Sequence, residues 1–311
     1  MTLIRKPSEL NIQTKIKALI YGQAGTGKST LALSAPRPLM LDFDGGVHRV
    51  NYSHQGATVQ ISSWEDCENV LKEDLKDYDS LVIDTGGKML DYMAEYIIRK
   101  NSKMGKSNGA LTLQGFGERK GMFRQFCRQI MIMNKHLIFV AHRDTQKINE
   151  DYRYVPMFGG SSYDDLVTDL DLVGYLEAVG KKRMITFDPS DRNDGKNTCN
   201  LPSQIELPLV VDASGNGLKN TFLTDHVINP YIANLESRRQ TSLKYEALLK
   251  EVKEQIDLIT DEVSANDFID RIDAFEHTGN SKAVSGKMLA DKAKSLHLKL
   301  NKAKRYERAE V

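Results

Sequence analysis

Residues 22–29 combine glycines, a lysine and a hydroxyl group in an order that suits phosphate binding. They read Gly-Gln-Ala-Gly-Thr-Gly-Lys-Ser, a complete match to the pattern G-x-x-x-x-G-K-[ST]. Glycines let backbone N–H groups turn inward around phosphate oxygens without Cβ clashes. Lys28 can reach the β- and γ-phosphates of a nucleotide, and Ser29 can ligate the Mg²⁺ that bridges them. The segment predicts a nucleoside triphosphate site formed by Gly22, Gln23, Ala24, Gly25, Thr26, Gly27, Lys28, Ser29 and Thr30.

The elements around this loop are the ones that must position it. An apolar run at 16–21 leads into the loop, and a helix-like segment at 29–33 follows it. A helix that starts at the loop points its positive end at a bound anion. The alternative to a phosphate loop is a glycine-rich turn that happens to contain a lysine. Such a turn would not require this strand–loop–helix context.

Two acidic positions follow apolar strands and are candidates for the chemistry of hydrolysis. Asp84 ends the run 80–84 and is placed to hold Mg²⁺. In AAA+ ATPases a glutamate usually comes directly after that aspartate, but here Thr85 follows, so a catalytic carboxylate must come from elsewhere. Asp44, after the strand 38–43, is the candidate to orient the attacking water. The alternative is that Asp42 and Asp44 only end a strand and begin a turn.

His142 follows the apolar run 136–141 at a comparable position. Ligands of open α/β sheets bind at the carboxyl ends of the strands, so this side chain could sense the γ-phosphate. The alternative is a structural histidine. A small-molecule kinase is disfavoured because the sequence shows no arginine-rich lid.

Composition and charge set further limits. The 311 residues carry a net charge of +1, so any affinity for nucleic acid must come from local basic patches. The three cysteines (Cys67, Cys127 and Cys199) lie far apart and indicate reduced, structural residues. The N-terminus lacks the apolar core of a signal peptide, and the apolar runs are too short to span a bilayer. We expect a cytoplasmic protein, in a host's cytoplasm if the source is viral.

Alternating strand and helix patterns predict an α/β fold with a mainly parallel sheet, and closely spaced later strands predict an antiparallel extension at one edge. Expected strands are 16–21, 38–43, 57–61, 80–84, 136–141, 171–178, 183–188 and 207–211. Expected helices in this part are 28–35, 64–76, 87–101 and 117–134.

The chain divides by composition into an N-terminal arm (1–14), a core (15–235) and a C-terminal helical domain (236–311). The last domain is expected to hold three helices, at 238–260, 264–277 and 282–306. Residues 282–308 carry nine bases and two acids, whereas 251–276 are mainly acidic. The basic last helix either has a solvated face within a small bundle or contacts nucleic acid or an acidic neighbour.

The succession of phosphate loop, Asp44, Asp84 and His142 resembles the RecA-like recombinase core. Within that group the chain is most similar to phage-encoded nucleotide-binding proteins described as RecA-like single-strand annealing ATPases. The likeness covers roughly residues 14–212. Besides these motifs, the segments that support it are 41–46, 141–142, 159–161, 169–173, 187–190 and 195–197. The chain departs from the group at two positions, since a glutamate is usual at Asp44 and an amide at His142.

The resemblance implies an ATP- and Mg²⁺-dependent ATPase that binds single-stranded DNA through two mobile loops. These loops would lie at 100–118 and 143–160, and the second carries Tyr152, Tyr154 and Phe158, which could stack on bases. The expected DNA-binding residues are Lys100, Lys103, Lys106, Arg119, Lys120, Arg143, Lys147 and Arg153. Solvated, non-binding loops are the alternative.

Lys196 lies where related subunits present a lysine to a neighbour's nucleotide. The resemblance therefore implies a homo-oligomer, ring or filament, with nucleotide at the subunit interfaces and catalytic roles for Lys28, Asp44, His142 and Lys196. The expected function is DNA recombination, single-strand annealing or replication, with a single-strand-binding or replication protein as a further partner. An NTP-driven adaptor or loader that grips a protein through its C-terminal helices is the alternative.

Overall fold

The computed structural model describes residues 5, 9, 12–148, 151–159 and 163–309. They form two compact units, one of residues 13–232 and another that contains 233–311. Most of the expected arm at 1–14, and Gly160 and Ser161 of the resemblance, lie outside the described residues. Among the helices of these ranges, none combines the length and the apolar composition that crossing a bilayer requires.

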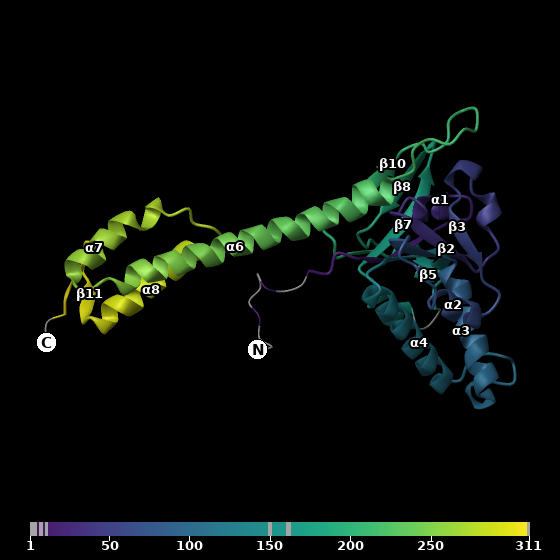
Figure 1. Ribbon diagram of the computed structural model, residues 1–311, viewed down its shortest axis with the longest axis horizontal. Helices are drawn as coiled ribbons and strands as arrows, with labels where there is room; N and C mark the ends of the chain where they lie inside the picture. Colours follow the sequence, from purple (N-terminus) through teal and green to yellow (C-terminus); the bar gives the residue numbers. More distant parts are fainter. Residues whose placement is uncertain (1–4, 6–8, 10–11, 149–150, 160–162, 310–311) are drawn as a thin grey trace. The chain divides into compact units, whose positions relative to one another are not determined.

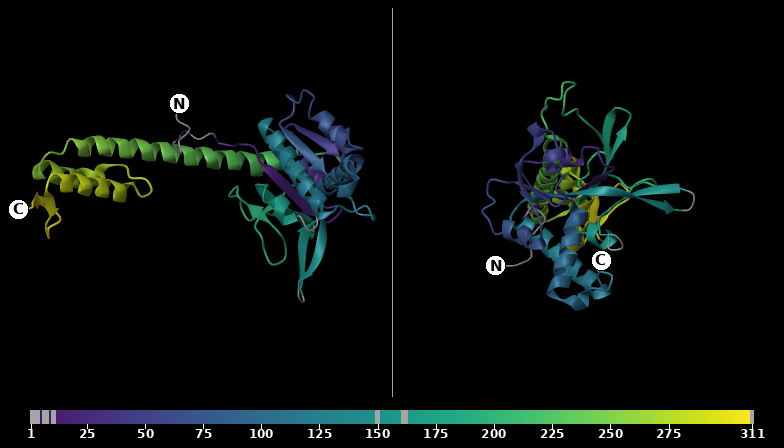
Figure 2. Two further views of the ribbon diagram at one scale, coloured as in Figure 1. Left: turned by 90° about the horizontal axis from the view of Figure 1, so that it is seen from below. Right: turned by 90° about the vertical axis from the view of Figure 1, so that its right-hand side faces the viewer.

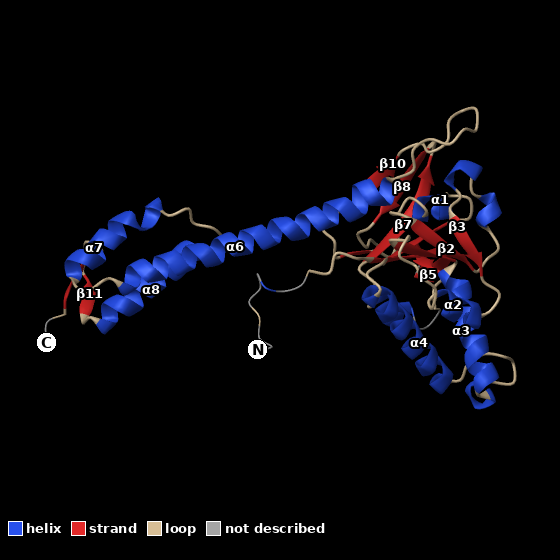
Figure 3. Cartoon of the chain, viewed as in Figure 1, coloured by secondary structure: helices blue, strands red, loops and turns tan. Residues whose placement is uncertain are grey.

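The first unit is built on one mixed sheet, which confirms the predicted fold class (Figures 1 and 3). Its strand order is β10-β8-β7-β1-β5-β4-β2-β3, and the strands from β7 to β3 in this order are parallel. Their bounds are β1 Lys17–Gly22, β2 Pro38–Asp42, β3 Ala57–Gln60, β4 Ser80–Asp84, β5 His136–Ile148 and β7 Leu172–Val179. The motif-bearing strands β1, β5, β4 and β2 are therefore direct neighbours.

The predicted antiparallel extension lies on the β7 side. β8 (Lys182–Thr186) pairs with β7, β10 (Gln204–Leu207) pairs with β8, and the short β9 (Lys196–Asn197) also pairs with β7. The strand expected at 207–211 lies earlier in the chain, since β10 ends at Leu207. Val211 instead bridges Gly217 and closes a turn of its own.

Crossover helices follow the strands, and three of those described here begin at a hydroxyl side-chain cap. They are α1 (Lys28–Ala32), α2 (Trp64–Val70), α3 (Gly86–Lys100), α4 (Leu113–Ile132) and α5 (Tyr163–Val167). Ser63 forms a capping box with Asp66, and Thr85 caps α3. Helix α4 starts four residues before the expected 117, because the Thr112 hydroxyl accepts a hydrogen bond from the N–H of Gly115 at 3.2 Å.

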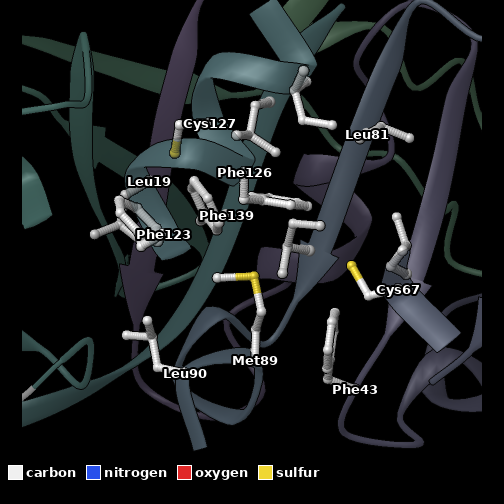
Figure 4. Close-up of a cluster of buried hydrophobic side chains, with 14 of the residues drawn as sticks. Leu19, Phe43, Cys67, Leu81, Met89, Leu90, Phe123, Phe126, Cys127 and Phe139 are labelled. Carbon is white, nitrogen blue, oxygen red and sulfur yellow. The ribbon is translucent and has the colours of Figure 1, made fainter. Parts of the chain in front are cut away.

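Alternate residues of the central strands enter two different apolar clusters, as a sheet covered on both faces requires. Leu19 packs on the side of α2, α3 and α4, whereas Ile20 packs on the side of α1. Figure 4 shows the first cluster, in which Phe123, Phe126 and Phe139 lie near the centre. Cys67 and Cys127 belong to this cluster, and burial raises the pKa of each thiol to about 12.

The expected mobile loop at 143–160 is largely a β-hairpin, so this prediction was wrong. β5 continues to Ile148 and pairs with β6 (Asp151–Pro156) in register from Arg143↔Pro156 to Ile148↔Asp151. Figure 2 shows these two strands extending away from the rest of the sheet. Cross-strand pairs such as Thr145↔Tyr154 stabilise this region despite its many charges.

The second unit contains most of α6 (Asn229–Asp257), with α7 (Glu262–Arg271) and α8 (Ser281–Ser295). The expected helix at 282–306 was predicted too long. The chain leaves α8 at His297, which has φ 56°, and forms the hairpin of β11 (Leu298–Leu300) and β12 (Tyr306–Arg308). The buried Leu298 and Tyr306 pack against the helices, which favours the hairpin over continued helix.

The bases of 282–308 are divided between this helix and this hairpin, and several pair with acids of the same unit. Arg305 lies 2.7 Å from Asp270, and Lys282 lies 2.6 Å from Asp273. Lys299 and Arg308 make longer contacts with Glu307 and Glu262. The opposite charges seen along the sequence therefore meet within one small bundle, and a contact of these bases with nucleic acid stays a prediction.

Phe139→Ala should lower the free energy of unfolding by about 3–5 kcal/mol. Phe139 has no exposed surface, and its ring lies 5.4–6.5 Å from those of Phe123, Phe126 and Phe158. Urea denaturation measures the effect. Tyr52→Ala, at an aromatic residue that is 89% exposed, is the matched control and should change stability by less than about 0.5 kcal/mol. Equal effects of the two substitutions would contradict this core assignment.

A second prediction concerns pH. Burial, assisted by the charge of Lys15, lowers the pKa of His136 to about 4. The unfolded chain, with a histidine pKa of about 6.5, therefore binds this proton more readily than the folded chain. Stability should fall as the pH drops from about 6.5 towards 4, by as much as about 1.4 kcal/mol per pH unit from this group.

His136→Gln should flatten this pH dependence, measured as urea midpoints across the same range. The same substitution at His48, an exposed residue, controls for the loss of an imidazole. A pH dependence that is as steep in His136→Gln as in the wild type would contradict the prediction.

Candidate functional site

The loop between β1 and α1 has the backbone conformation that its glycines permit. Gly25 and Gly27 adopt φ of 76° and 93°, values that favour glycine. Gly22 has a different constraint, because a Cβ at this position would lie 2.1 Å from the carbonyl oxygen of Leu176 in β7. The loop therefore leaves the sheet at a point of close backbone approach and turns into α1 at Lys28.

Lys28 and Thr26 are held by the loop itself. The Lys28 ammonium donates to the carbonyl oxygen of Gln23 at 2.8 Å, and the Thr26 hydroxyl donates to the same oxygen at 2.9 Å. Lys28 is 6% exposed, and burial lowers its pKa while the nearby Asp84 opposes the shift. A buried ammonium beside a ring of backbone N–H groups is well suited to bind phosphate oxygens.

The predicted side chains meet in one pocket of about 250 Å³. It is lined by residues of the loop and of α1 and by residues at or after the ends of β2 and β4, together with His142 of β5. Those predicted from the sequence are Ala24, Gly25, Gly27, Lys28, Ser29, Thr30, Asp44, Asp84 and His142. Parallel strands bring their carboxyl ends to one edge of the sheet, which explains this convergence.

Asp84 has the environment of a metal ligand. Burial raises its pKa, the negative charges of Asp42 and Asp44 raise it further, and a hydrogen bond from Ser29 and the charge of Lys28 oppose this. A divalent cation would relieve the repulsion among these carboxylates. Within the described ranges no group of three or more His, Cys, Asp or Glu side chains could hold a metal alone. Ser29 and Asp84 would therefore hold Mg²⁺ together with nucleotide oxygens and water, as is usual for this ion.

Asp42 and Asp44 have different roles. The buried Asp42 carboxylate accepts hydrogen bonds from the backbone N–H groups of Asp44, Gly46 and Val47 at 3.1–3.2 Å, so it forms a turn. The turn places Asp44 in the pocket, where its carboxylate lies 3.8 Å from the guanidinium of Arg49. The turn interpretation therefore fits Asp42, whereas Asp44 remains the candidate to orient water.

Arg49 also lines the pocket and was not identified from the sequence. Its guanidinium is a cation that suits the binding of phosphate oxygens. The sequence feature that could have identified Arg49 is its position, five residues after Asp44 and shortly after the strand expected at 38–43.

His142 does not end its strand, as was expected, but lies within β5 opposite Gly22 of β1. It lines the phosphate-loop pocket and also an adjoining pocket of about 520 Å³, and Asp44 and Thr85 are likewise shared by the two. The adjoining pocket is also lined by Arg119 of α4 and by Asp144 of the β5–β6 hairpin. A single strand therefore connects the phosphate-loop pocket to the hairpin.

The basic residues of the expected first DNA loop lie on ordered structure. Lys100 ends α3, Lys103 lies in the short helix η4 (Ser102–Met104), and Lys106 begins a tight turn closed by a bridge between Gly105 and Leu111. Arg119 and Lys120 lie in α4. Arg119 is buried, which lowers its pKa, and it donates to the carbonyl oxygen of Gly159 at 3.2 Å. The loop expected within 100–118 is therefore the short connection between α3 and α4, and its binding of DNA stays a prediction.

Two of the basic residues expected in the second loop have partners within the fold. The Arg143 guanidinium lies 4.1 Å from the centre of the Tyr154 ring and donates to the Tyr175 hydroxyl at 3.0 Å. Arg153 pairs with Asp194 at 2.7 Å. Lys147 and Tyr152, which face each other across the hairpin, are exposed.

Phe158 is fully buried in the aromatic cluster with Phe123 and Phe139. The expectation that Phe158 stacks on bases was therefore wrong.

Lys196 lies outside the pocket around the phosphate loop. Its ammonium donates to the carbonyl oxygens of Val167 and Thr168, both at 3.1 Å, beside the end of α5. The described contacts give this lysine a structural role within the chain. Its contribution to a neighbour's nucleotide stays a prediction, as does the oligomer.

Comparison with known proteins gives a family for this chain. The family model described as an AAA domain matches residues 14–199, which is more than half of the chain. No curated protein matches. The match agrees with the prediction of a P-loop nucleotide-binding ATPase, and it shows that Thr85 in place of a glutamate does not exclude an AAA-type domain.

Asp84→Asn should raise the melting temperature of the nucleotide-free protein at neutral pH. The pKa of Asp84 is raised on folding, so ionisation costs stability as the pH rises through the window above about 3.9, the usual aspartate pKa. Asparagine avoids this cost, so the difference from the wild type should disappear below that pH. The affinity for Mg²⁺–ATP should fall at least about tenfold.

Asp79→Asn is the control of opposite sign, because a hydrogen bond from Arg37 lowers the pKa of Asp79. This substitution should lower the melting temperature at neutral pH. Thermal melts and calorimetric titrations measure both variants. A lower melting temperature of Asp84→Asn, with unchanged Mg²⁺–ATP affinity, would contradict the assignment.

Proposed function

We propose that this chain, which belongs to the AAA domain family, is an ATP- and Mg²⁺-dependent ATPase that binds single-stranded DNA. The family match supports nucleotide binding and hydrolysis. The resemblance to phage-encoded RecA-like annealing ATPases supports the finer part, a role in recombination, single-strand annealing or replication. In this proposal ATP controls the affinity for DNA.

The residues of the phosphate-loop pocket have the chemistry that hydrolysis requires. Backbone N–H groups of 24–29 and the Lys28 ammonium would bind the β- and γ-phosphates, and Ser29 and Asp84 would hold Mg²⁺. The ion would neutralise charge that develops on the phosphates. Asp44 would orient a water molecule for in-line attack. Its side chain is one methylene shorter than the usual glutamate, so we expect slow hydrolysis.

The observation that carries the coupling is the position of His142. This residue lines the phosphate-loop pocket and the adjoining pocket, and it belongs to the strand that continues into the β5–β6 hairpin. Its carbonyl oxygen accepts a hydrogen bond at 2.8 Å from the N–H of Met157, just after β6. A γ-phosphate that shifts the His142 side chain would therefore act on both strands at the base of the hairpin.

The hairpin presents groups suited to single-stranded nucleic acid. Lys147 and Tyr152 are cross-strand neighbours, and both are exposed. An ammonium can neutralise a backbone phosphate while an aromatic ring stacks on a base, a combination that binds single strands with little sequence preference. Lys100, Lys103 and Lys106 supply a second basic segment for the phosphate backbone.

The test is binding of a fluorescent oligothymidylate, measured by anisotropy with and without a non-hydrolysable ATP analogue. In the wild type the analogue should tighten binding at least about fivefold, a typical coupling between two sites. In Lys28→Ala the analogue should have no effect. The double variant Lys147→Ala/Tyr152→Ala should weaken DNA binding while leaving the affinity for nucleotide unchanged.

Lys72→Ala/Tyr52→Ala removes an exposed lysine and an exposed tyrosine from other parts of the same unit and is the matched control. This control should bind DNA like the wild type. Binding that is absent, insensitive to salt or unaffected by the analogue in the wild type would contradict the proposal.

A further inference from the structure

Arg49 and Asp44 form an ion pair at the phosphate-loop pocket, and this pair is a weak one. The Nη1 atom of Arg49 lies 3.8 Å from Oδ2 of Asp44, which is beyond the usual range of a hydrogen bond. The Arg49 side chain is 68% exposed. Ion pairs that are this exposed contribute little to stability, so little free energy is lost when the guanidinium takes another partner.

The backbone that carries Arg49 is held in place, whereas its side chain is long and exposed. Val47–Arg49 form one turn of 3-10 helix, in which the N–H of Arg49 donates to the carbonyl oxygen of Gly46 at 3.0 Å. Val50 is buried in the cluster on the α1 side of the sheet, and the Gln55 amide donates to its carbonyl oxygen at 2.8 Å. Rotation within the side chain can therefore move the guanidinium while the supporting turn stays fixed.

The charges of the pocket call for a cation beside Asp44 when a triphosphate binds. Among the described residues that line the pocket, Lys28 and Arg49 carry a permanent positive charge. Lys28 is held at the loop by the carbonyl oxygen of Gln23, and Mg²⁺ would neutralise Asp84. The Asp44 carboxylate, which is proposed to orient the attacking water, would lie close to the γ-phosphate. Two anions at close range repel each other, and Arg49 is placed to reduce this repulsion.

We infer that Arg49 exchanges partners when ATP binds, so that its guanidinium leaves Asp44 and contacts the γ-phosphate. This inference rests on the proposed ATPase function and assigns a substrate contact to a residue outside the phosphate-loop motif. A guanidinium presents its donors in a fixed fork that matches phosphate oxygens, and hydrogen bonds between two charged groups are the strong ones. The exchange leaves the Asp44 carboxylate free to accept a hydrogen bond from the attacking water.

The exchange also gives the pocket a means to distinguish ATP from ADP. ADP lacks the γ-phosphate, so with ADP bound the Arg49 guanidinium stays beside Asp44. The affinity that Arg49 contributes is therefore specific to ligands with a third phosphate, and this specificity is what an experiment can measure.

The test compares Mg²⁺–ADP with the Mg²⁺ complex of a non-hydrolysable ATP analogue, by isothermal titration calorimetry on the full chain. The wild type should bind both. Arg49→Ala should lose about tenfold in affinity for the analogue and keep its ADP affinity within about twofold, which also shows that the variant is folded. Arg49→Lys keeps the charge without the fork and should recover part of the loss.

A double-mutant cycle tests the link between Arg49 and Asp44. In the wild-type background Arg49 already screens the carboxylate, so Asp44→Asn should change the affinity for the analogue by less than about twofold. In the Arg49→Ala background the repulsion is unscreened, and the same substitution should raise this affinity at least about threefold. Equal effects of Asp44→Asn in the two backgrounds would overturn the exchange of partners.

Arg124→Ala is the matched control, since it removes a 46% exposed arginine that pairs with Asp169 at 3.0 Å and does not line the phosphate-loop pocket. This control should bind both ligands like the wild type. An Arg49→Ala variant that binds the analogue as tightly as the wild type would overturn the γ-phosphate contact, and so would an equal loss for the two ligands.

The wild type alone separates this inference from the proposal on which it rests. A wild type that binds neither ligand would overturn the proposed nucleotide binding itself. A wild type that binds both, with an Arg49→Ala variant that does so equally well, would overturn the role of Arg49 and leave the proposed function intact.

Discussion

Parallel pairing of four neighbouring strands is the constraint on which the site depends. β1 pairs with β5, β5 with β4 and β4 with β2, so the carboxyl ends of all four lie at one edge. The phosphate loop and the turn that presents Asp44 follow two of these ends, and Asp84 is the last residue of a third. Residues more than 50 positions apart in the chain meet there because backbone hydrogen bonds fix the register.

The same geometry creates an electrostatic cost that a ligand can remove. Asp42, Asp44 and Asp84 are close enough to raise the pKa of Asp84, and Lys28 is buried beside them. Asp42 is stabilised by three backbone N–H groups, whereas the charged form of Asp84 is favoured by a hydrogen bond from Ser29 and by the charge of Lys28. The folded protein therefore holds charges that Mg²⁺ and phosphates would neutralise. Binding sites commonly lower the stability of the fold in this way, because the groups that bind a ligand interact unfavourably with one another.

The sequence predicted the parallel core well because its signals are local. A buried parallel strand requires a short apolar run, and the phosphate loop requires glycines at fixed spacing, so both could be located directly. The β5–β6 hairpin could not, because its stability comes from cross-strand pairs such as Thr145↔Tyr154 between residues that look like a charged loop. The end of α8 was missed for a similar reason. Leu298 and Tyr306 favour a hairpin only through tertiary packing against the helices.

The close approach at Gly22 has a mechanical consequence. Because the backbone of β7 leaves no room for a side chain there, the first residue of the phosphate loop rests against the carbonyl oxygen of Leu176. β7 also carries the antiparallel edge strands β8 and β10, and these contribute to a largely apolar pocket of about 270 Å³ that lies beside the loop. A displacement of that edge would be transmitted through β7 to the base of the loop without an intervening side chain. Backbone pairing therefore links the apolar pocket, through β8 and β7, to the residues that would bind phosphate.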